Sequence, residues 1–585
     1  MRRRNLFPWL IAIACGLVGL SLLIVALLPY EAMKSALDPL SRDGNLSMLR
    51  PDDAIAFRFL IGTASACIFG FGYLTGKRLW KRVIDFSKRL WRDCRSFFSI
   101  PAKLKAEVGF QAALLVVTAM AVVHRLAFIE NPMLHDEAYT VVTFADTIFH
   151  AMTDYSLPNN HIFHTILVNL SVRAFGLAPW TVRLPAFLAG ALLVPGVYCL
   201  ARRIYDPWTG LAAGILVAFS PSLASYSTNA RGYTLVALFA LLILILGNYV
   251  RREKNLLAWG LIGIFSALGV YTVPVMLFPF GILFTWLFLE NLFANPAPYS
   301  SKWDFLRYWL ITGLLTAFLT LILYTPILIY TGPQKLFANG FVAPLPWGDL
   351  ADTWRARLTD TWTEWTGGVP LAVIIVLAAG WILSLVFHRK LSANRLPLQL
   401  AAILAIAILL FVQRPNPWAK VWVFLLPLML MWAAAGIVGL LRNVRLKFMG
   451  NLSLASIVTI GALLAGAGST VQLIPKLPAL WAQRGDVENA ILYLKDHMSD
   501  TDLIVVDSPD DAPAWFYALE YGIPNIHFDK RIPYIQAWIL VDPPDGQTVE
   551  SVLADRGPDF PALDLASIRL IQEVGARQIF ECPIK

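Results

Sequence analysis

Thirteen apolar runs, each close to the length of a bilayer-spanning helix, dominate the sequence and limit what it can fold into. Roughly 20 apolar residues span a bilayer core as a helix, and a spanning segment must satisfy its own backbone hydrogen bonds. Of the 585 residues, 57% are hydrophobic and only 15% are charged, whereas soluble domains carry about 25% charged residues. The sequence therefore predicts a mainly α, polytopic membrane protein. The expected spans are 6–29, 54–76, 108–128, 184–201, 208–225, 232–250, 257–273, 274–292, 308–331, 369–387, 397–413, 420–440 and 452–473.

Positive charges give the expected orientation, because Lys and Arg collect on the cytoplasmic side of membrane proteins. The apolar run behind MRRRN is too long for a signal peptide, so we expect an uncleaved first span and a cytoplasmic N-terminus. Segment 77–107 has ten Lys or Arg and three acidic residues. Its aromatic side chains favour an amphipathic helix on the anionic inner leaflet, with a solvated linker helix as the alternative. This basic excess requires no nucleic-acid partner.

The Lys and Arg clusters in the later loops all fall on the cytoplasmic side only if 160–176 does not cross the membrane. This run is short, and His161, His164 and Asn169 interrupt it, so we expect a helix at the outer surface. If it does span, the order of the next helices changes. Thirteen spans then place the C-terminus outside a multi-pass protein of the inner or plasma membrane. We therefore expect three regions. Residues 1–107 hold two extra spans and the basic segment. Residues 108–474 form a membrane core with outer loops 129–160 and 332–368, and residues 475–585 form an extracytoplasmic domain.

The end of the chain differs in composition from the membrane core. From Pro475 onward it holds 18 acidic and 9 basic residues. The runs DLIVVD and AWILVD predict two strands packed on both faces. DVENAILYLKDHM and TVESVLADRG predict helices, the second with Thr548 as its N-cap. A small α/β domain is therefore expected. No glycine-rich phosphate loop follows either strand, so the sequence assigns this domain no nucleotide site and no catalytic role.

Three adjacent titratable residues, His135, Asp136 and Glu137, follow the third apolar run. Neighbouring carboxylates suit a loop or a helix start, where one faces a cavity and the other accepts backbone hydrogen bonds. Their mutual repulsion is expected to raise one pKa, which favours a general base that works near neutral pH. The same carboxylates, with His161, are candidate ligands of a divalent metal. The alternatives are a solvated loop face and an N-cap formed by Asp136.

Further polar side chains fall at the expected outer ends of other spans. Each has an ordinary explanation, since surface histidines are solvated, arginines reach lipid headgroups, and Tyr and Trp form interfacial belts. Lys and Arg are nevertheless scarce on the outer side, and a cavity with cationic and carboxylate walls suits a phosphate-bearing substrate. The candidates for the phosphate are Arg231, Lys420 and Arg414, and those for the cavity are His135, Tyr139, Asn160, His164, Tyr233, Tyr271 and Trp418.

Six stretches follow one another along the chain and carry a family resemblance: HDEAYT, NNHIFHTILVNLSVRAFG, WTVRLPAFLAGALLVPGVYCLARRIYD, SPSLASYSTNARGYTLVALFALL, YTVPVMLFPF and PWAKVWVFLLPLML. Together they resemble the GT-C glycosyltransferases of the protein O-mannosyltransferase and aminoarabinose-transferase type, in the bacterial branch that includes RgtA/B/C/D-like domains. The resemblance covers about 108–440. Each stretch is degenerate, and their order is specific for the superfamily rather than for a sugar.

The resemblance implies an enzyme that transfers sugar from a polyprenyl-phosphate-linked donor. It implies that Asp136, with Glu137 as its neighbour, deprotonates an acceptor hydroxyl or orients it, and that basic and aromatic groups hold the lipid phosphate. Some relatives carry Lys-Pro-Pro or His-Pro-Pro after the first loop, whereas this chain reads Asn160-His161-Ile162-Phe163, without prolines. His161 is therefore expected at the phosphate in place of a lysine. A single in-line displacement inverts the anomeric centre without a covalent sugar–enzyme intermediate. No cofactor is implied with certainty, and a requirement for a divalent metal stays open.

Two other functions are compatible with the composition. A transporter or flippase of lipid-linked sugars places ionisable groups midway through spans, and a non-catalytic scaffold for envelope assembly would use the C-terminal domain as a binding module. The acceptor of a transferase is equally unspecified and is a glycan, a lipid or a protein. The expected spans are nearly free of charge and the polar groups gather at one face, which favours the transferase.

Overall fold

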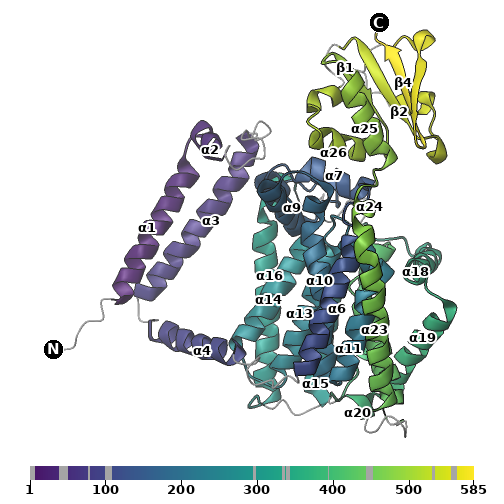
Figure 1. The fold of residues 1–585 in the computed structure, drawn as a ribbon. Helices are drawn as coiled ribbons and strands as arrows, with labels where there is room; N and C mark the ends of the chain where they lie inside the picture. Colours follow the sequence, from purple (N-terminus) through teal and green to yellow (C-terminus); the bar gives the residue numbers. More distant parts are fainter. Residues whose placement is uncertain are drawn as a thin grey trace.

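In the computed structural model the chain forms a bundle of long helices, with a helical hairpin beside it and a small α/β domain at one end (Figure 1). The structure describes residues 7–37, 51–76, 80–98, 108–293, 298–332, 336, 343–392, 394–442, 444, 452–529, 534–554 and 563–585.

Each expected span coincides with a helix or with a bent helix pair. These are α1 (Phe7–Leu27), α3 (Pro51–Gly76), α6 (Val108–Leu126), α10 (Pro179–Ile204), α11 (Pro207–Ala218) with α12 (Pro221–Ser227), α13 (Tyr233–Val250), α14 (Leu256–Thr272), α15 (Leu277–Phe293), α16 (Lys302–Tyr330), α19 (Leu371–Val386), α21 (Leu398–Gln413), α22 (Leu426–Leu441) and α23 (Leu454–Leu473). Within the described residues, six helices are long and apolar enough to cross a bilayer, or up to eight if each bent pair is one span. The mainly α membrane class is confirmed, and thirteen crossings stay a prediction.

Shorter helices lie at the two ends of the bundle, except for the first, which belongs to the hairpin beside it (Figure 1). They are α2 (Tyr30–Leu37), α4 (Trp80–Phe98), α7 (His135–Phe144), α8 (Ile148–Thr153), α9 (Ile162–Phe175), α18 (Leu350–Thr366), α20 (His388–Leu391) and α24 (Leu477–Trp481). Helices α4 and α20 lie at one end, and α7, α9, α18 and the C-terminal domain lie at the other (Figure 1). The basic segments and the expected outer loops are thus separated, as the charge pattern predicts. Arg2 to Arg4 fall outside the described residues, so the side of the N-terminus stays a prediction.

The C-terminal domain is a four-stranded sheet with helices. Its elements are α25 (Asp486–His497), β1 (Asp502–Val505), α26 (Asp511–Glu520), β2 (Gln536–Val541), α27 (Val549–Ala554), β3 (Arg569–Val574) and β4 (Arg577–Pro583). The strand order is β1-β2-β4-β3, with β1 and β2 parallel and the other pairs antiparallel. The two strands predicted from sequence are β1 and β2, and the Thr548 hydroxyl accepts from the Ser551 amide at 3.2 Å as an N-cap does. The hairpin β3–β4 was not predicted, because β3 is an edge strand whose side chains are mostly exposed and lack the apolar alternation of a half-buried strand.

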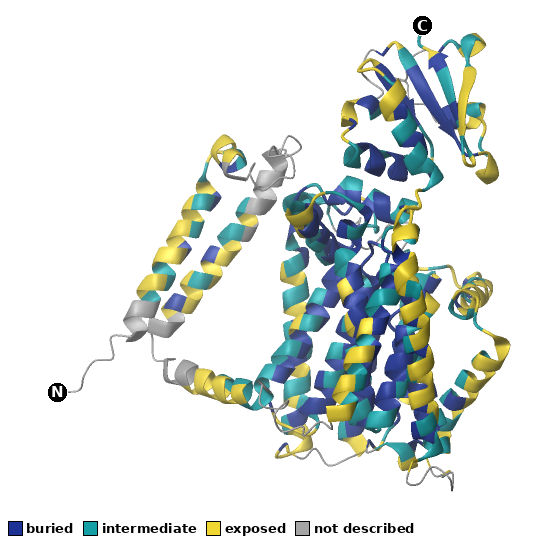
Figure 2. Cartoon of the chain, in the orientation of Figure 1, coloured by how far each residue is buried: buried dark blue, intermediate teal, exposed yellow. Residues whose placement is uncertain are grey.

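Burial follows the expected membrane environment. The interior of the bundle is buried, and exposed positions lie along the outward faces of its helices (Figure 2). Many of these exposed side chains are large and apolar, for example Leu115 on α6, Phe318 on α16 and Leu464 on α23. Apolar side chains on the outside of a helical bundle are favourable in lipid and unfavourable in water.

One buried arginine satisfies the backbone where a helix is broken. Helices α11 and α12 meet at a bend of 64°, and the break leaves carbonyls at the end of α11 without helical partners. Arg125, fully buried on α6, donates to the carbonyls of Ala218 at 3.1 Å and Val217 at 3.3 Å, and to the Ser227 hydroxyl at 3.1 Å. A cation at the C-terminal end of a helix is also favoured by the helix dipole.

Replacing Arg125 with Met is therefore expected to destabilise the bundle, because each carbonyl left unpaired in a dry interior costs about 1–3 kcal/mol. Thermal unfolding of the purified protein in lipid nanodiscs should show a midpoint several degrees below that of the wild type. Leu115→Ala, on the exposed face of the same helix, is the control. Equal midpoints for Arg125→Met and the wild type would contradict this role of Arg125.

Candidate active site

A buried ion pair organises the outer end of the bundle. Glu137 on α7 and Arg183 on α10 are both at most 1% exposed. The guanidinium binds both carboxylate oxygens, with Nε 3.1 Å from Oε2 and a second bond from Nη2 to Oε1. Arg183 also donates to the carbonyls of Ile129 at 2.9 Å and Asn131 at 2.6 Å. The pair thus fixes the chain that leads into α7.

The same carboxylate joins two distant segments. Glu137 Oε1 accepts from the Leu134 amide at 3.0 Å, and Oε2 accepts from the Ala230 amide at 2.7 Å. The start of α7 and the start of α13 are therefore held together by one side chain. With both oxygens occupied and no exposed surface, Glu137 is placed to position its neighbours rather than to act on a substrate. This is a correction to the catalytic role that the sequence suggested for it.

Asp136 lies beside this pair and meets two cations. Its side chain is 45% exposed, and Oδ2 lies 3.0 Å from Lys420 Nζ and 3.3 Å from Arg231 Nη1. Arg231, 4% exposed, also donates to the Asp136 carbonyl at 3.0 Å. The carboxylate, guanidinium and ammonium come from α7, the loop before α13, and the 3₁₀ turn Ala419–Trp422 before α22. The structure thus brings together the three groups that the sequence placed at one outer site.

The electrostatics of Asp136 differ from the sequence expectation. Burial acts to raise the pKa of this carboxyl, but the charges of Arg231 and Lys420 outweigh it, and its pKa lies below the ordinary value. The repulsion from Glu137 that was expected to raise a pKa is cancelled locally because Arg183 neutralises Glu137. Asp136 is consequently ionised at neutral pH, with Oδ2 facing the two cations.

His161 and Tyr233 surround Arg231. Arg231 Nη2 lies 3.4 Å from His161 Nε2, and its guanidinium lies 5.8 Å from the centre of the Tyr233 ring. The Gly232 amide donates to His161 Nδ1 at 2.9 Å, so the neutral imidazole carries its proton on Nε2. A Cβ on Gly232 would lie 2.5 Å from Thr272 Cγ2, which explains why a glycine stands where three helix ends converge.

The other predicted cavity residues take different places. His164 and Tyr271 are buried, at 0% and 2% exposed, and neither the His164 ring nitrogens nor the Tyr271 hydroxyl has a hydrogen-bond partner among the described residues. Tyr139 stacks on His135 at 5.8 Å between ring centres. Trp418 is 46% exposed, with the Arg357 guanidinium 3.2 Å from its ring centre.

The Arg414 side chain makes its contacts outside the cluster of Asp136, Arg231 and Lys420. Its guanidinium donates to the Leu345 carbonyl at 3.1 Å and lies over the Trp347 ring at 4.7 Å. Its backbone has φ 47°, a left-handed conformation that is uncommon for a residue other than glycine. This arginine therefore joins the two outer loops that carry α18 and Lys420, which corrects its predicted role at a phosphate.

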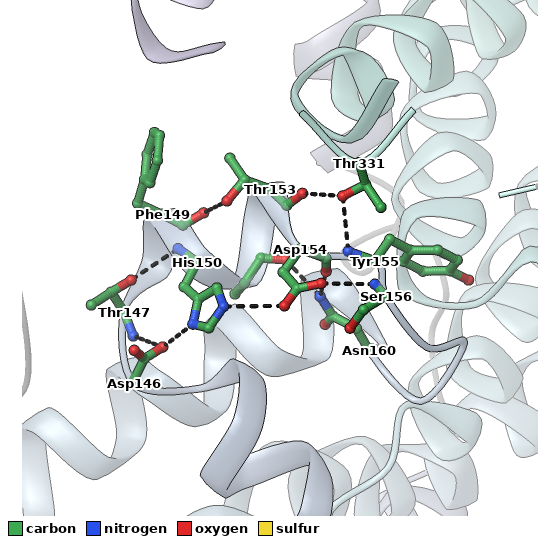
Figure 3. Close-up of polar contacts among 11 residues, drawn as sticks. Asp146, Thr147, Phe149, His150, Thr153, Asp154, Tyr155, Ser156, Asn160 and Thr331 are labelled. Carbon is green, nitrogen blue, oxygen red and sulfur yellow. Dashed lines mark hydrogen bonds and ion pairs between the residues drawn. The ribbon is translucent and has the colours of Figure 1, made fainter. Parts of the chain in front are cut away.

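Asn160 is likewise structural. Its amide donates to the carbonyls of Ala151 at 2.9 Å and Asp154 at 2.6 Å, and its side chain is 1% exposed. It closes a loop in which His150 bridges Asp146 at 2.8 Å and Asp154 at 3.2 Å (Figure 3). Burial acts to lower the pKa of His150, but hydrogen bonds to the two aspartates prevail and raise it to about 10. Sequence reasoning missed this bridge, although the i, i+4 spacing on both sides of His150 was a usable signal.

The C-terminal domain contacts the site directly. His135 Nε2 lies 3.1 Å from Asp511 Oδ1 on α26, and the Met133 amide donates to the Tyr517 hydroxyl at 2.9 Å. His135 Nδ1 lies 4.0 Å from Asp136 Oδ1. Asp511 and Tyr517 were not predicted from sequence, because no local pattern links a domain after residue 475 to the loop at 135.

The predicted metal ligands do not converge. In the part of the chain that the structure describes, no group of three or more His, Cys, Asp or Glu side chains is placed to hold a metal ion. Glu137 is engaged by Arg183, and His161 faces Arg231, so Asp136, Glu137 and His161 do not form the ligand set that the sequence suggested.

Glu137→Gln is expected to lower stability strongly, because breaking a buried ion pair leaves an uncompensated charge and costs about 3–5 kcal/mol. Asp136→Asn, one residue earlier and half exposed, is expected to unfold at nearly the wild-type temperature. Thermal unfolding in nanodiscs compares the two variants. Similar losses for both, or none for Glu137→Gln, would refute the positioning role of Glu137.

The His150 bridge is expected to depend on pH. A histidine whose folded pKa is raised stabilises the fold fully below its unfolded value of about 6.5, and this contribution is lost as pH rises through about 10. Hydrogen exchange in 146–160, corrected for the intrinsic effect of pH, should therefore accelerate near pH 10. His150→Gln should show fast exchange in this loop at every pH. A wild-type loop with constant protection up to pH 11 or so would disprove the role of the bridge.

Comparison with known proteins adds three observations. Residues 159–302 match the sequence family described as dolichyl-phosphate-mannose-protein mannosyltransferase. No curated protein matches the sequence of this chain. The structure is similar to that of ArnT from Cupriavidus metallidurans bound to undecaprenyl phosphate, with 12% identity and a TM-score of 0.50 over 81% of this chain and 98% of ArnT.

A weaker similarity is found to the oligosaccharyltransferase of Archaeoglobus fulgidus, with 13% identity and a TM-score of 0.44 over 72% of this chain and 64% of that protein. The likeness to ArnT concerns the fold, and the family match covers the segment that carries His161 and Arg231. The chain has the fold of a GT-C membrane glycosyltransferase, which confirms the resemblance predicted from its sequence.

Proposed function

We propose that this protein transfers a sugar from a polyprenyl-phosphate-linked donor to an acceptor hydroxyl at the outer face of the membrane, with Asp136 as the base. The observation that carries the proposal is the meeting of Asp136 with Arg231 and Lys420 at the end of the bundle opposite the basic helix α4. One carboxylate with two cations leaves a net positive charge in the cluster. Such a site attracts a substrate with a phosphate group.

The two cations suit the phosphate of the donor. Arg231 is nearly buried, and its Nε has no hydrogen-bond partner among the described residues. Arg231 Nη2 donates to Asn159 Oδ1 at 3.3 Å and also faces His161 Nε2 at 3.4 Å. Because Nε2 carries the proton in the neutral ring, this N–H points at another donor and lacks an acceptor among the described residues. A phosphate oxygen supplies that acceptor. ArnT, which is similar to this chain in fold, binds undecaprenyl phosphate in its crystal structure, and this lipid supports the proposed class of donor.

The free oxygen of Asp136 suits the acceptor. Oδ2 faces Lys420 and Arg231, and Oδ1 points toward His135 at 4.0 Å. In the proposed reaction the acceptor oxygen attacks the anomeric carbon, and its proton passes to Asp136. The bond between that carbon and the phosphate oxygen breaks, and Arg231 and Lys420 stabilise the charge that develops on the leaving lipid phosphate. One displacement of this kind inverts the anomeric centre.

Loss of the base should abolish transfer without loss of the fold. Asp136→Asn is expected to reduce the rate by at least about 100-fold, since general base catalysis contributes 10²–10⁴. The assay incubates the nanodisc-embedded protein with a panel of labelled undecaprenyl-phosphate sugars and follows sugar transfer or release of undecaprenyl phosphate. Full activity of Asp136→Asn would remove the assigned base. Wild-type movement of the lipid across vesicles without cleavage would favour a flippase instead.

Lys420→Met should weaken binding of undecaprenyl phosphate by roughly 10- to 100-fold, the equivalent of one charge-assisted hydrogen bond of about 1.5–3 kcal/mol. Arg414→Gln is the matched control, because it also removes one outer cation but its guanidinium contacts Leu345 and Trp347. Calorimetric titration of each nanodisc-embedded variant with the lipid phosphate distinguishes them. Equal weakening in both variants would contradict a specific phosphate contact.

A further inference from the structure

Helix α4 (Trp80–Phe98) separates its side chains into two faces. At 3.6 residues per turn, the apolar side chains within 85–97 gather on one side, and the basic side chains Lys88, Arg89, Arg92 and Arg95 gather on the other, all four exposed. On the apolar side Phe86 is 53% exposed and Trp91 is 68% exposed. Large apolar side chains at this level of exposure, next to a cationic face, are unfavourable in water and typical of a membrane interface.

The C-terminal half of α4 is fixed to the bundle. Asp93 Oδ2 accepts from the Leu256 amide at 2.7 Å, and the Asp93 carbonyl accepts from Asn255 Nδ2 at 3.0 Å. Phe97 packs edge-on against Tyr249 at 5.7 Å between ring centres. These contacts hold the helix against the turn between α13 and α14, and they leave the basic face and the two exposed aromatic rings free of the bundle.

The direction of α4 matches a surface helix. Figure 1 shows it lying across the direction of the bundle helices, at the end that also carries α20 and opposite α7. A helix that crosses the direction of the membrane spans at their end lies along the membrane surface. The turn after α13 lies at this same end, where Lys254 pairs with Asp304 at 2.6 Å and Glu253 is exposed beside Arg252. Among the described residues of this turn and α4, the unpaired positive charge is therefore that of α4 itself.

We propose that α4 is a docking surface for the anionic phospholipid headgroups of the leaflet at this end of the bundle. Lys88, Arg89, Arg92 and Arg95 contact the phosphates, and Phe86 and Trp91 enter the boundary of the acyl chains. The apolar helices α3 and α6 precede and follow α4 in the chain, so they keep it near the bilayer. This proximity and the exposed aromatic rings favour a lipid partner over a soluble anion. The proposal is independent of the transferase activity.

Hydrogen exchange of 85–98 in the full chain tests the proposal, in nanodiscs of phosphatidylcholine alone and of phosphatidylcholine with phosphatidylglycerol. The wild type is expected to exchange more slowly when phosphatidylglycerol is present. Lys88→Gln/Arg92→Gln should lose most of this effect, since each neutralised cation weakens binding roughly fivefold. Salt at about 1 M, where the screening length is about 3 Å, should abolish it in the wild type.

Two controls separate lipid binding from general effects. Arg355→Gln/Lys476→Gln removes the same charge from exposed positions on α18 and before α24, and it should keep the full response to phosphatidylglycerol. Trp91→Ser should speed exchange in both lipids, because it removes apolar anchoring and leaves the charge. A second variant, Arg89→Gln/Arg95→Gln, repeats the test if Lys88→Gln/Arg92→Gln fails to fold. A wild type that responds equally to both lipids, or a control pair that loses the response as Lys88→Gln/Arg92→Gln does, overturns the proposal.

Discussion

The bidentate pair between Glu137 and Arg183 is the interaction on which the outer end of the molecule depends. It satisfies backbone groups of the loop before α7 and the Ala230 amide before α13, so two segments about 90 positions apart become one rigid unit. A buried ion pair adds little net stability compared with apolar packing, yet it is costly to break. Its contribution here is geometric, because Asp136 and Arg231 are the immediate neighbours of the groups that it holds.

Buried side chains also form hydrogen bonds with otherwise unpaired backbone carbonyls at two other places in the structure. Arg125 closes the break between α11 and α12, and Asn160 closes the loop around α8. In each case a buried side chain replaces the water that lipid and packing exclude. Within the Asp136 cluster, the side chains of Asp136 and Lys420 are 45% and 38% exposed, whereas Arg231 is 4% exposed.

The sequence predicts most of the fold, since each apolar run of spanning length contains a helix and the two apolar strands form β1 and β2. It also predicts that Asp136, Arg231 and Lys420 share one site. It does not separate Asp136 from Glu137, because the difference between them comes from Arg183, 46 positions away. Nor does it distinguish Lys420 from Arg414, whose left-handed backbone turns its side chain toward Trp347. The contact between His135 and Asp511 depends on domain docking and has no local pattern.

The central claim is that the cluster of Asp136, Arg231 and Lys420 receives the phosphate of a lipid-linked sugar. Electron cryomicroscopy of the protein in nanodiscs with undecaprenyl phosphate tests it most directly. We expect a phosphate within hydrogen-bond distance of the Arg231 guanidinium and the Lys420 ammonium, with Asp136 Oδ1 open toward His135. A phosphate bound at another place, with the contacts of Asp136 to both cations unchanged, would contradict the claim.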